Sequence, residues 1–294
     1  MSFAGHRPRK RFGQHWLVDP TVLDRIVAAA ELRPGERVLE IGPGRGALSE
    51  RLLATPLGAL VAVELDRDLL TGLQQRFGTD PRFQLIEGDG LEVALEPEGQ
   101  PRADAVVANI PYNITGPLLE RLVGRLDRPV LPPYRRLVLL VQREVGERIR
   151  ARAGESAFSA LSVRLQLLAR CRSVCAVPPR CFAPPPRVDS EVIVLDPLPP
   201  EQLLPLAQAR AVEMLLRQAF AARRKMLRNT LAPVADPDTL LASATAAGIA
   251  LAQRPQEVAP EQWVALAAAL AAAGGGHSGA PVGTAACLSP PPGS

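Results

Sequence analysis

An alternation of short apolar runs with helical segments of about ten residues is the feature that most constrains the fold of this chain. The apolar runs cover residues 37–41, 59–63, 83–86, 105–108 and 136–141. Strands separated by helices of this length form βαβ units, which place parallel strands in one sheet with helices on both faces. We therefore predict an α/β fold built on a Rossmann-like, doubly wound sheet.

The alternation ends near residue 200, where the sequence Pro197-Leu198-Pro199-Pro200 interrupts it. The pattern is then helical over residues 206–220, 223–231, 239–247 and 261–272. Residues 274–294 are rich in Gly, Pro, Ser and Ala, a composition typical of disorder. The predicted organisation is a basic N-terminal segment (1–19), a sheet domain (20–199), a smaller all-helical C-terminal domain (200–273) and a disordered tail (274–294).

The charge balance is too mild for a protein whose whole surface binds polyanions, because 34 basic and 30 acidic residues leave a formal charge of +4. Binding of nucleic acid must therefore rest on local basic clusters. The N-terminal residues lead into Phe12-Gly13-Gln14 rather than an apolar stretch, and no run is apolar enough to span a bilayer. We expect a soluble, cytoplasmic protein without membrane contact, and a monomer. The four cysteines lack zinc-site spacing, so we predict no metal.

Glycine and acidic residues stand at the ends of three consecutive predicted strands. Gly42 and Gly44 belong to a Gly-x-Gly-x-Gly loop, which lacks the GxGxxG spacing of nicotinamide dehydrogenases. Glu64 ends the second strand, where a carboxylate can accept both hydroxyls of a ribose, and Asp89 follows the third, where it could accept an adenine amino group. Each alone is explained by a tight turn or a solvated strand end. Together they favour a cofactor that contains adenosine, because ligands bind at the carboxyl ends of parallel strands.

Asn109-Ile110-Pro111-Tyr112 follows the fourth strand and indicates the chemistry. An exocyclic amine on an aromatic base is a poor nucleophile, because its lone pair is delocalised into the ring. The Asn109 side-chain oxygen and the Ile110 carbonyl could accept its hydrogens and favour a tetrahedral, nucleophilic nitrogen, while Pro111 fixes the turn. Tyr112 can stack on the base, and stacking of about 1–3 kcal/mol offsets much of the cost of unstacking it. The alternative is an ordinary turn with a half-buried tyrosine.

In these segments the chain resembles the ribosomal RNA adenine dimethyltransferases. The resemblance covers residues 9 to about 230, in six segments: 9–17 (RKRFGQHWL), 40–44 (EIGPG), 63–66 (VELD), 109–114 (NIPYNI), 182–190 (FAPPPRVDS) and 220–225 (FAARRK). It implies a methyltransferase sheet that uses S-adenosylmethionine. It further implies dimethylation of the N6 amines of two adjacent adenines near the 3′ end of small-subunit (16S) ribosomal RNA, within an immature small subunit during ribosome biogenesis.

The resemblance also assigns site residues. The implied cofactor residues are Gln14, His15, Leu17, Gly42, Gly44, Glu64, Asp89 and Asn109. The implied target-base residues are Asn109, Ile110, Pro111 and Tyr112, with Phe182 as a second stacking face. Without the resemblance, Phe182 would be taken as a core residue. His15 and Trp16 stand where the family usually has asparagine and phenylalanine, and a ring nitrogen of His15 could replace the amide as a hydrogen-bond donor.

Two basic clusters are predicted to bind RNA. The first is Arg9, Lys10 and Arg11, and the second is Arg217, Arg223, Arg224, Lys225 and Arg228. On a continuous helix Arg217, Arg224 and Arg228 would share one side. A solvated face is the plainer explanation, but beside a base-modifying pocket we favour phosphate contacts, which weaken with salt.

Three other functions are weighed against this one. A large-subunit ribosomal RNA methyltransferase of the macrolide-resistance type shares the Asn-x-Pro-Tyr signature, but the proline-rich segment 182–190 and the helical second domain favour the small-subunit substrate. A DNA adenine methyltransferase is disfavoured because nothing resembles a sequence-reading domain. A non-catalytic ribosome assembly factor would not need Glu64 and Asp89, and we expect assembly and methylation roles to coexist.

Overall fold

A seven-stranded sheet lies at the centre of the molecule, a computed structural model that describes residues 15–96 and 98–275. Its strands are β2 (Arg37–Ile41), β3 (Ala59–Glu64), β4 (Phe83–Glu87), β5 (Ala105–Asn109), β8 (Arg136–Gln142), β9 (Ala169–Val177) and β11 (Ser190–Pro197). In the order β4-β3-β2-β5-β8-β11-β9 the first five are parallel, whereas β11 runs antiparallel to β8 and β9. The predicted α/β sheet and its five strands are confirmed; β9 and β11 were not predicted.

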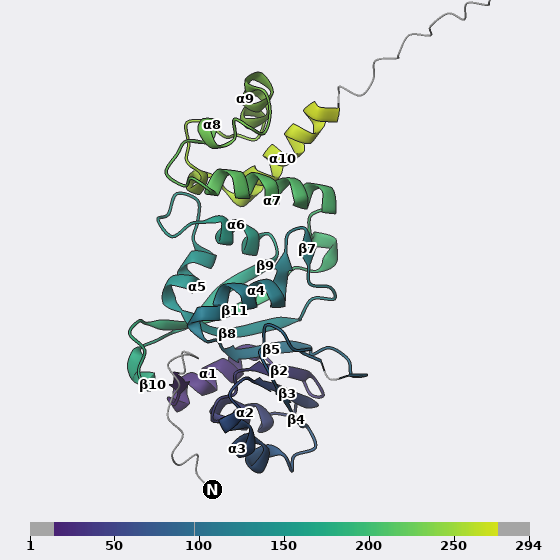
Figure 1. Cartoon of the computed structure of the whole chain (residues 1–294), viewed down its shortest axis with the longest axis vertical. Helices are drawn as coiled ribbons and strands as arrows, with labels where there is room; N and C mark the ends of the chain where they lie inside the picture. Colours follow the sequence, from purple (N-terminus) through teal and green to yellow (C-terminus); the bar gives the residue numbers. More distant parts are fainter. Residues whose placement is uncertain (1–14, 97, 276–294) are drawn as a thin grey trace, which may run out of the picture.

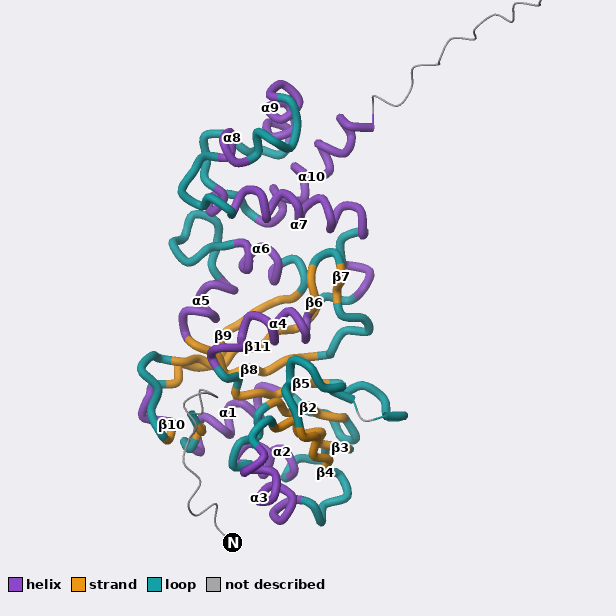
Figure 2. Tube along the Cα trace, viewed as in Figure 1, coloured by secondary structure: helices purple, strands orange, loops and turns teal. Residues whose placement is uncertain are grey.

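Helices cover both faces of this sheet, as predicted. They are α1 (Pro20–Ala30), α2 (Ala47–Leu53), α3 (Arg67–Phe77), α4 (Thr115–Val123), α5 (Arg143–Arg150) and α6 (Ala160–Gln166). Helices α1 to α3 pack on one face and α4 to α6 on the other (Figure 1). Figure 2 shows the strands in orange between these two sets of purple helices.

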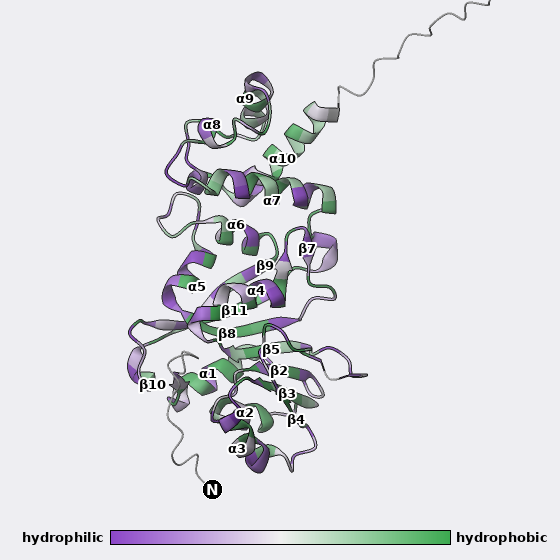
Figure 3. Ribbon diagram, in the orientation of Figure 1, coloured by the Kyte–Doolittle hydropathy of each residue, from purple (hydrophilic) through white to green (hydrophobic). Residues whose placement is uncertain are grey.

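The sheet divides the apolar core into two layers, because successive side chains of a strand point to opposite faces. In β2, Val38 packs with α1 to α3, whereas its neighbour Leu39 packs with the helices of the other face. Both are fully buried, and burying such a side chain contributes about 1.5–3 kcal/mol. Figure 3 shows the central strands largely in green, the hydrophobic end of the scale. This packing fixes the strand ends at one edge of the sheet.

The C-terminal part is helical, as predicted, and lies beyond α5 and α6 (Figure 1). Its helices are α7 (Leu206–Phe220), α8 (Leu227–Thr230), α9 (Pro237–Ala246) and α10 (Pro260–Gly275). Val212 of α7 and Trp263 of α10 belong to the same hydrophobic cluster as Leu39 of the sheet. The core therefore continues across residue 200, and the division of the chain into domains at that point stays a prediction.

The second basic cluster spans a break between two helices, so Arg217 does not share one continuous helix with Arg224 and Arg228. Residues 221–226 separate α7 from α8. The amides of Leu227 and Arg228 donate to the carbonyls of Gln253 (2.8 Å) and Leu251 (2.9 Å) instead of continuing the hydrogen bonds of α7. Contacts to a distant turn thus accompany the start of α8 at Leu227, four residues after the start of the predicted helical segment 223–231.

Two small sheets complete the fold. The strand β1 (Trp16–Leu17) pairs antiparallel with β10 (Phe182–Ala183), and β6 (Gly124–Arg125) pairs with β7 (Arg128–Pro129). The short 3-10 helices are η2 (Tyr112–Ile114), η3 (Pro179–Cys181), η4 (Pro200–Gln202) and η5 (Pro255–Glu257). The β1–β10 pairing brings the start of the described chain beside the connection from β9 to β11. Over residues 15–96 and 98–275, no helix has the length and apolar character needed to cross a membrane.

Candidate active site

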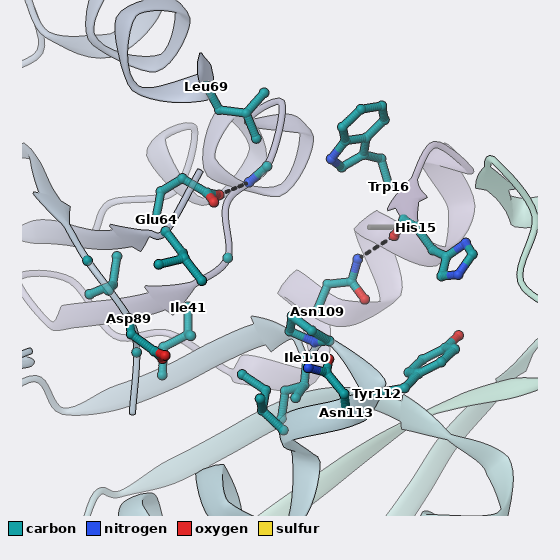
Figure 4. A pocket seen from close by; sticks show the side chains of 18 residues that line it. His15, Trp16, Ile41, Glu64, Leu69, Asp89, Asn109, Ile110, Tyr112 and Asn113 are labelled. Carbon is teal, nitrogen blue, oxygen red and sulfur yellow. Dashed lines mark hydrogen bonds between the residues drawn. The ribbon is translucent and has the colours of Figure 1, made fainter. Parts of the chain in front are cut away.

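A cavity of about 170 Å³ lies at the carboxyl ends of β2, β3, β4 and β5 (Figure 4). Nine of the predicted site residues line it: His15, Gly42, Gly44, Glu64, Asp89, Asn109, Ile110, Pro111 and Tyr112. Leu17 and Phe182 do not line it. The predicted residues Arg9, Lys10, Arg11 and Gln14 lie outside the described residues. The structure therefore brings the four strand ends together as the sequence predicts.

The glycine loop after β2 needs glycine for conformation and for space. Gly42 and Gly44 have positive φ angles, 72° and 58°, which residues with a Cβ rarely adopt. A Cβ on Gly44 would lie 2.8 Å from Cδ1 of Trp16, so the Trp16 ring fits only against a glycine. The guanidinium of Arg45 lies over the Trp16 ring, 4.0 Å from its centroid. The loop thus forms one wall of the cavity together with Trp16.

Glu64, at the end of β3, directs a buried carboxylate into the cavity (Figure 4). One carboxylate oxygen accepts from the amide of Gly44 at 3.0 Å and the other from the amide of Asp66 at 2.8 Å. Burial raises the pKa of Glu64, and these two hydrogen bonds oppose that effect. They fix the orientation of the carboxylate, and each oxygen keeps a lone pair for a ligand hydroxyl.

Asp89, two residues after β4, lines the same wall. Its Oδ1 accepts from the amide of Leu91 at 2.8 Å, which orients the side chain. The turn before it is tight, because a Cβ on Gly88 would collide with Val93. Gly90 is similarly close to Ile41, because a Cβ added to Gly90 would lie 2.9 Å from Cγ2 of Ile41. Close packing of Gly88 against Val93 and of Gly90 against Ile41 therefore holds this turn in place. The second carboxylate oxygen of Asp89 is left for a ligand.

Asn109 and Ile110 stand at the end of β5, opposite Glu64 (Figure 4). The Asn109 side-chain nitrogen donates to the carbonyl of His15 at 3.1 Å. The Ile110 amide donates to the carbonyl of Leu140 on β8 at 3.2 Å, and its side chain is buried. The side-chain nitrogen of Asn109 is thus held by a hydrogen bond. The side-chain oxygen of Asn109 is the group left to bind a ligand.

Tyr112 begins η2, and its ring also lines the cavity. Its hydroxyl lies 2.6 Å from Oγ of Ser190, the first residue of β11. Burial raises the pKa of Tyr112, with the Ser190 hydrogen bond opposing, so the phenol stays neutral near pH 7. Tyr112 therefore offers a neutral ring face whose edge is fixed by one hydrogen bond.

Comparison with known proteins decides the family. A family model described as ribosomal RNA adenine dimethylase matches residues 5–272. The chain belongs to this family. The protein is therefore a methyltransferase of the family that dimethylates adenine in ribosomal RNA.

Individual dimethylase relatives are similar over nearly the whole chain. A ribosomal RNA small subunit methyltransferase A from Parasynechococcus marenigrum is 68% identical over 282 residues, covering 94% of this chain and 93% of its own length. A protein of the same name from Prochlorococcus marinus is 63% identical over 270 residues, covering 92% of this chain and 96% of its own length.

Two solved structures share the fold of this dimethylase. A dimethyladenosine transferase from Plasmodium falciparum has a TM-score of 0.71 at 26% identity, covering 86% of this chain and 96% of its own. The 23S rRNA methyltransferase ErmE has a TM-score of 0.68 at 28% identity, covering 87% of this chain and 99% of its own. The identity to ErmE is far below the 68% shared with the small-subunit methyltransferase of Parasynechococcus marenigrum.

Two predicted dimethylase residues lie elsewhere in the structure. Leu17 and Phe182 pair directly between β1 and β10, and their side chains are only 5% and 4% exposed. Both pack in the core layer formed by α1 to α3. In this structure Phe182 packs in the core, and its expected stacking role stays a prediction. The cause of this packing is the β1–β10 pairing, which turns the Phe182 side chain inward.

Two residues without a role predicted from the sequence support the dimethylase site. Ser190 holds the Tyr112 hydroxyl, as described above. Glu40, fully buried on β2, accepts from the hydroxyl of Ser49 on α2 at 2.6 Å and so ties the strand to the helix that follows the glycine loop. Burial raises the pKa of Glu40 to about 8, so its carboxyl is largely protonated near pH 7. A charged residue within the apolar run 37–41 was the signal that could have pointed to Glu40.

The second basic cluster of the dimethylase is only partly available to RNA. Arg223 donates to the carbonyls of Ser156 and, at 2.9 Å, Phe158, so it ties the α7–α8 connection to the loop before α6. Arg223 thus makes a structural contact, and its predicted phosphate contact stays a prediction. The other members, which we call the α7–α8 basic cluster, are Arg217, Arg224, Lys225 and Arg228. All four are exposed, and the part of the chain that the structure describes provides no carboxylate partner for them.

Proposed function

We propose that this enzyme uses S-adenosylmethionine to dimethylate the N6 amines of two adjacent adenines near the 3′ end of small-subunit ribosomal RNA. The proposed substrate is an immature small ribosomal subunit, which the enzyme meets as a monomer in the cytoplasm. One observation carries the proposal: a single cavity joins the acidic side chains Glu64 and Asp89 to the acceptor Asn109 and the ring of Tyr112. These residues suit an adenosine cofactor on one side and a target adenine on the other.

The cavity residues fit S-adenosylmethionine. Glu64 is a buried, oriented carboxylate, a group that is costly to bury unless a ligand or protein donor satisfies it. Two ribose hydroxyls would supply such donors, and the oxygen of Asp89 not bonded to Leu91 would accept the adenine amino group. The glycine loop at Gly42 and Gly44 lets the rest of the cofactor approach the backbone. When bound, S-adenosylmethionine supplies an electrophilic sulfonium methyl group.

The target adenine is proposed to enter beside Asn109 and Tyr112. The Asn109 oxygen and the Ile110 carbonyl would accept the two amine hydrogens, which draws the nitrogen toward a tetrahedral geometry with an available lone pair. Pro111 fixes the turn between these acceptors and the Tyr112 ring. The protein thus acts mainly by holding the amine in place and polarising it, which are effects of proximity and orientation.

Binding of the ribosomal particle is proposed to use the α7–α8 basic cluster together with Arg9, Lys10 and Arg11. Figure 3 draws the α7–α8 connection in purple, the hydrophilic end of the scale. Four exposed basic side chains without acidic partners among the described residues suit contacts with RNA phosphates, which carry no sequence information but position the substrate. The helical part, proposed as a separate domain from residue 200, would therefore hold the particle while the sheet domain acts on the base.

The test is methyl transfer from labelled S-adenosylmethionine to unmethylated small ribosomal subunits, with large subunits and DNA assayed in parallel. The expected result is paired reverse-transcription stops at adjacent adenines near the 3′ end of the small-subunit RNA. Label in large subunits alone would replace the proposal with the macrolide-resistance type of substrate. Tight particle binding without label in any substrate would leave only an assembly role.

A further inference from the structure

We infer that Ser190 is a positioning residue for methyl transfer, because its hydroxyl fixes the Tyr112 ring beside the acceptors of the target amine. The inference rests on the proposed function, in which the Tyr112 ring stacks on the target adenine. The two hydroxyl oxygens lie 2.6 Å apart, near the short end of the range for hydrogen bonds between hydroxyl groups. Figure 4 shows the Tyr112 hydroxyl at the end of its side chain that points away from Asn109. The contact therefore holds the ring at the end remote from the proposed amine position.

The Tyr112 ring depends on this contact because its own element holds it weakly. Tyr112 begins the three-residue 3-10 helix η2, none of whose residues is buried. The Ile114 amide donates to the Pro111 carbonyl at 3.1 Å, which fixes the turn but not the side-chain torsions of Tyr112. Within the part of the chain that the structure describes, the Tyr112 side chain makes its hydrogen bond with Ser190 alone. Loss of this bond would let the ring turn about its side-chain bonds.

Ser190 can fix the ring because it is itself held on both sides. It is the first residue of β11, is fully buried, and pairs with Gln142 of β8 on one side and Val177 of β9 on the other. A buried hydroxyl is costly unless it is hydrogen-bonded, and Tyr112 is its partner. The central sheet, rather than a loop, therefore sets the position of the Ser190 hydroxyl.

Strand β8 connects Ser190 to the acceptors of the target amine. The Ile110 amide donates to the carbonyl of Leu140 at 3.2 Å, and Leu140 lies two residues before Gln142, the partner of Ser190. Two residues of a strand span about 6.5 Å. One strand thus sets the position of Ile110 and, through Ser190, that of the Tyr112 ring. This arrangement suits a site that must hold a base and its amine in a single geometry.

The same geometry assigns the Tyr112 hydroxyl no part in the chemistry. Its hydrogen bond is made with Ser190, whereas the proposed acceptors of the amine hydrogens are Asn109 and Ile110. Removing the phenol oxygen and removing the Ser190 hydroxyl each break the same contact and keep the aromatic ring. The two changes should therefore have the same effect on methyl transfer.

The test is a double-mutant cycle with Tyr112→Phe, Ser190→Ala and the double variant, assayed with labelled S-adenosylmethionine on unmethylated small ribosomal subunits. Each single substitution is expected to lower kcat/KM for the particle roughly 2- to 13-fold, the factor that corresponds to the net contribution of one hydrogen bond. The double variant should lose no more than either single variant. The dissociation constant for S-adenosylmethionine, measured by calorimetry without particles, should stay unchanged, because neither residue is a proposed cofactor residue.

Ser173→Ala is the matched control, because it also removes a serine hydrogen bond from the central sheet. Ser173 lies on β9, donates to Glu191 at 3.0 Å and does not line the cavity. This variant should keep the native kcat/KM, which distinguishes an effect on ring position from a small loss of stability. If Ser190→Ala does not fold, Ser190→Cys takes its place in the cycle, since a thiol of similar size is a much weaker hydrogen-bond donor.

Nuclear magnetic resonance of the tyrosines gives a readout that does not depend on activity. The chain has two tyrosines, Tyr112 and Tyr134, so protein isotopically labelled at tyrosine Cζ gives two signals. Ser190→Ala should shift the Tyr112 signal, which Tyr112→Phe identifies by its absence. The signal of Tyr134, buried in the core layer of α4 to α6, should not move. Ser173→Ala should leave both signals in place.

Four results would overturn the inference. They are an unchanged kcat/KM in Ser190→Ala, losses that multiply in the double variant, a much larger loss in Tyr112→Phe than in Ser190→Ala, and a Tyr112 signal that Ser190→Ala does not shift. The third of these would give the phenol a part in the chemistry. If the native enzyme itself fails to label small subunits, the proposed function fails, whereas the Tyr112 signal still shows whether Ser190 holds the ring.

Discussion

The side-chain nitrogen of Asn109 donates a hydrogen bond to the backbone carbonyl of His15, with 3.1 Å between the two atoms. This contact joins the end of β5 to a residue 94 positions earlier in the chain. Because the donor side of the amide is used, the acceptor side is fixed toward the cavity. The main-chain carbonyl of His15, a residue distant in sequence, therefore orients the Asn109 oxygen, which is the acceptor that the proposed chemistry requires.

Replacing Asn109 by alanine is expected to abolish methyl transfer while cofactor binding remains measurable. The variant loses an acceptor aimed at the target amine, and loss of one such preoriented group typically costs about 10²–10³-fold in rate. Glu64 and Asp89 are untouched, so calorimetry should still detect S-adenosylmethionine. Full activity of Asn109→Ala toward small subunits would contradict the proposed chemistry.

Replacing Glu64 by alanine is expected to weaken S-adenosylmethionine binding about 10- to 100-fold, since hydrogen bonds to a charged group contribute about 1.5–3 kcal/mol. Glu87 provides a matched control, because it lies beside Glu64 in the β3–β4 register but is exposed and outside the cavity lining. Glu87→Ala should leave the dissociation constant unchanged. Equal effects of the two substitutions would remove the ribose role of Glu64.

The stability of the protein without cofactor is expected to fall as pH rises from about 4.5 to about 8, because of Glu40. Its folded pKa is raised from 4.5 to about 8 by burial, so the folded state holds a proton that the unfolded state releases. The contribution of the protonated Glu40 to the free energy of unfolding is complete below pH 4.5 and is lost above pH 8. Its upper limit is on the order of 5 kcal/mol.

Glu40→Gln should therefore flatten the dependence of the urea midpoint on pH and raise stability most above pH 8. Ser49→Ala should have the opposite effect, since the Ser49 hydrogen bond lowers the pKa of Glu40. Identical pH profiles for the native protein and Glu40→Gln would show that Glu40 does not carry this proton.

Trp16 is expected to report cofactor binding by fluorescence. It lines the cavity against Gly44, whereas Trp263, the other tryptophan of the chain, is fully buried in the helical part. Addition of S-adenosylmethionine should change the emission of the native protein and of Trp263→Phe, but not that of Trp16→Phe. A change that persists in Trp16→Phe would place the affected ring at Trp263.

The strand-end residues could be predicted from sequence because they depend on local pattern. Each parallel strand is an apolar run, and parallel strands end at the same edge, so Gly42, Glu64, Asp89 and Asn109 had to converge once the runs were recognised. The same reasoning placed α2 and α3 between the strands. These features need no knowledge of contacts between distant parts of the chain.

The features that sequence reasoning did not predict depend on such distant contacts. Phe182 is buried because a two-residue strand pairs with Leu17, 165 positions earlier, and two residues carry no periodic pattern. Helix α8 begins at Leu227 rather than at residue 223, and its first amides donate to the carbonyls of Gln253 and Leu251. The contact between the His15 and Tyr112 rings was likewise not predicted, and residues Pro184 and Ser190 lie within hydrogen-bond distance of the ring edges.

The α7–α8 basic cluster is expected to contribute to particle binding through its charge. Arg224→Ala combined with Lys225→Ala should weaken binding of small subunits and lower the salt dependence, by a slope of roughly 0.7–0.9 for each phosphate that is no longer neutralised. Arg210 is the matched control, because it is an exposed arginine on α7 with no acidic partner among the residues that the structure describes. Arg210→Ala should leave both the affinity and the slope unchanged. Arg223→Ala should instead lower the thermal midpoint, since its guanidinium holds the carbonyls of Ser156 and Phe158. Filter binding over a series of salt concentrations measures the slopes, and equal slopes for the native protein and the double variant would rule out a role for this cluster in phosphate binding.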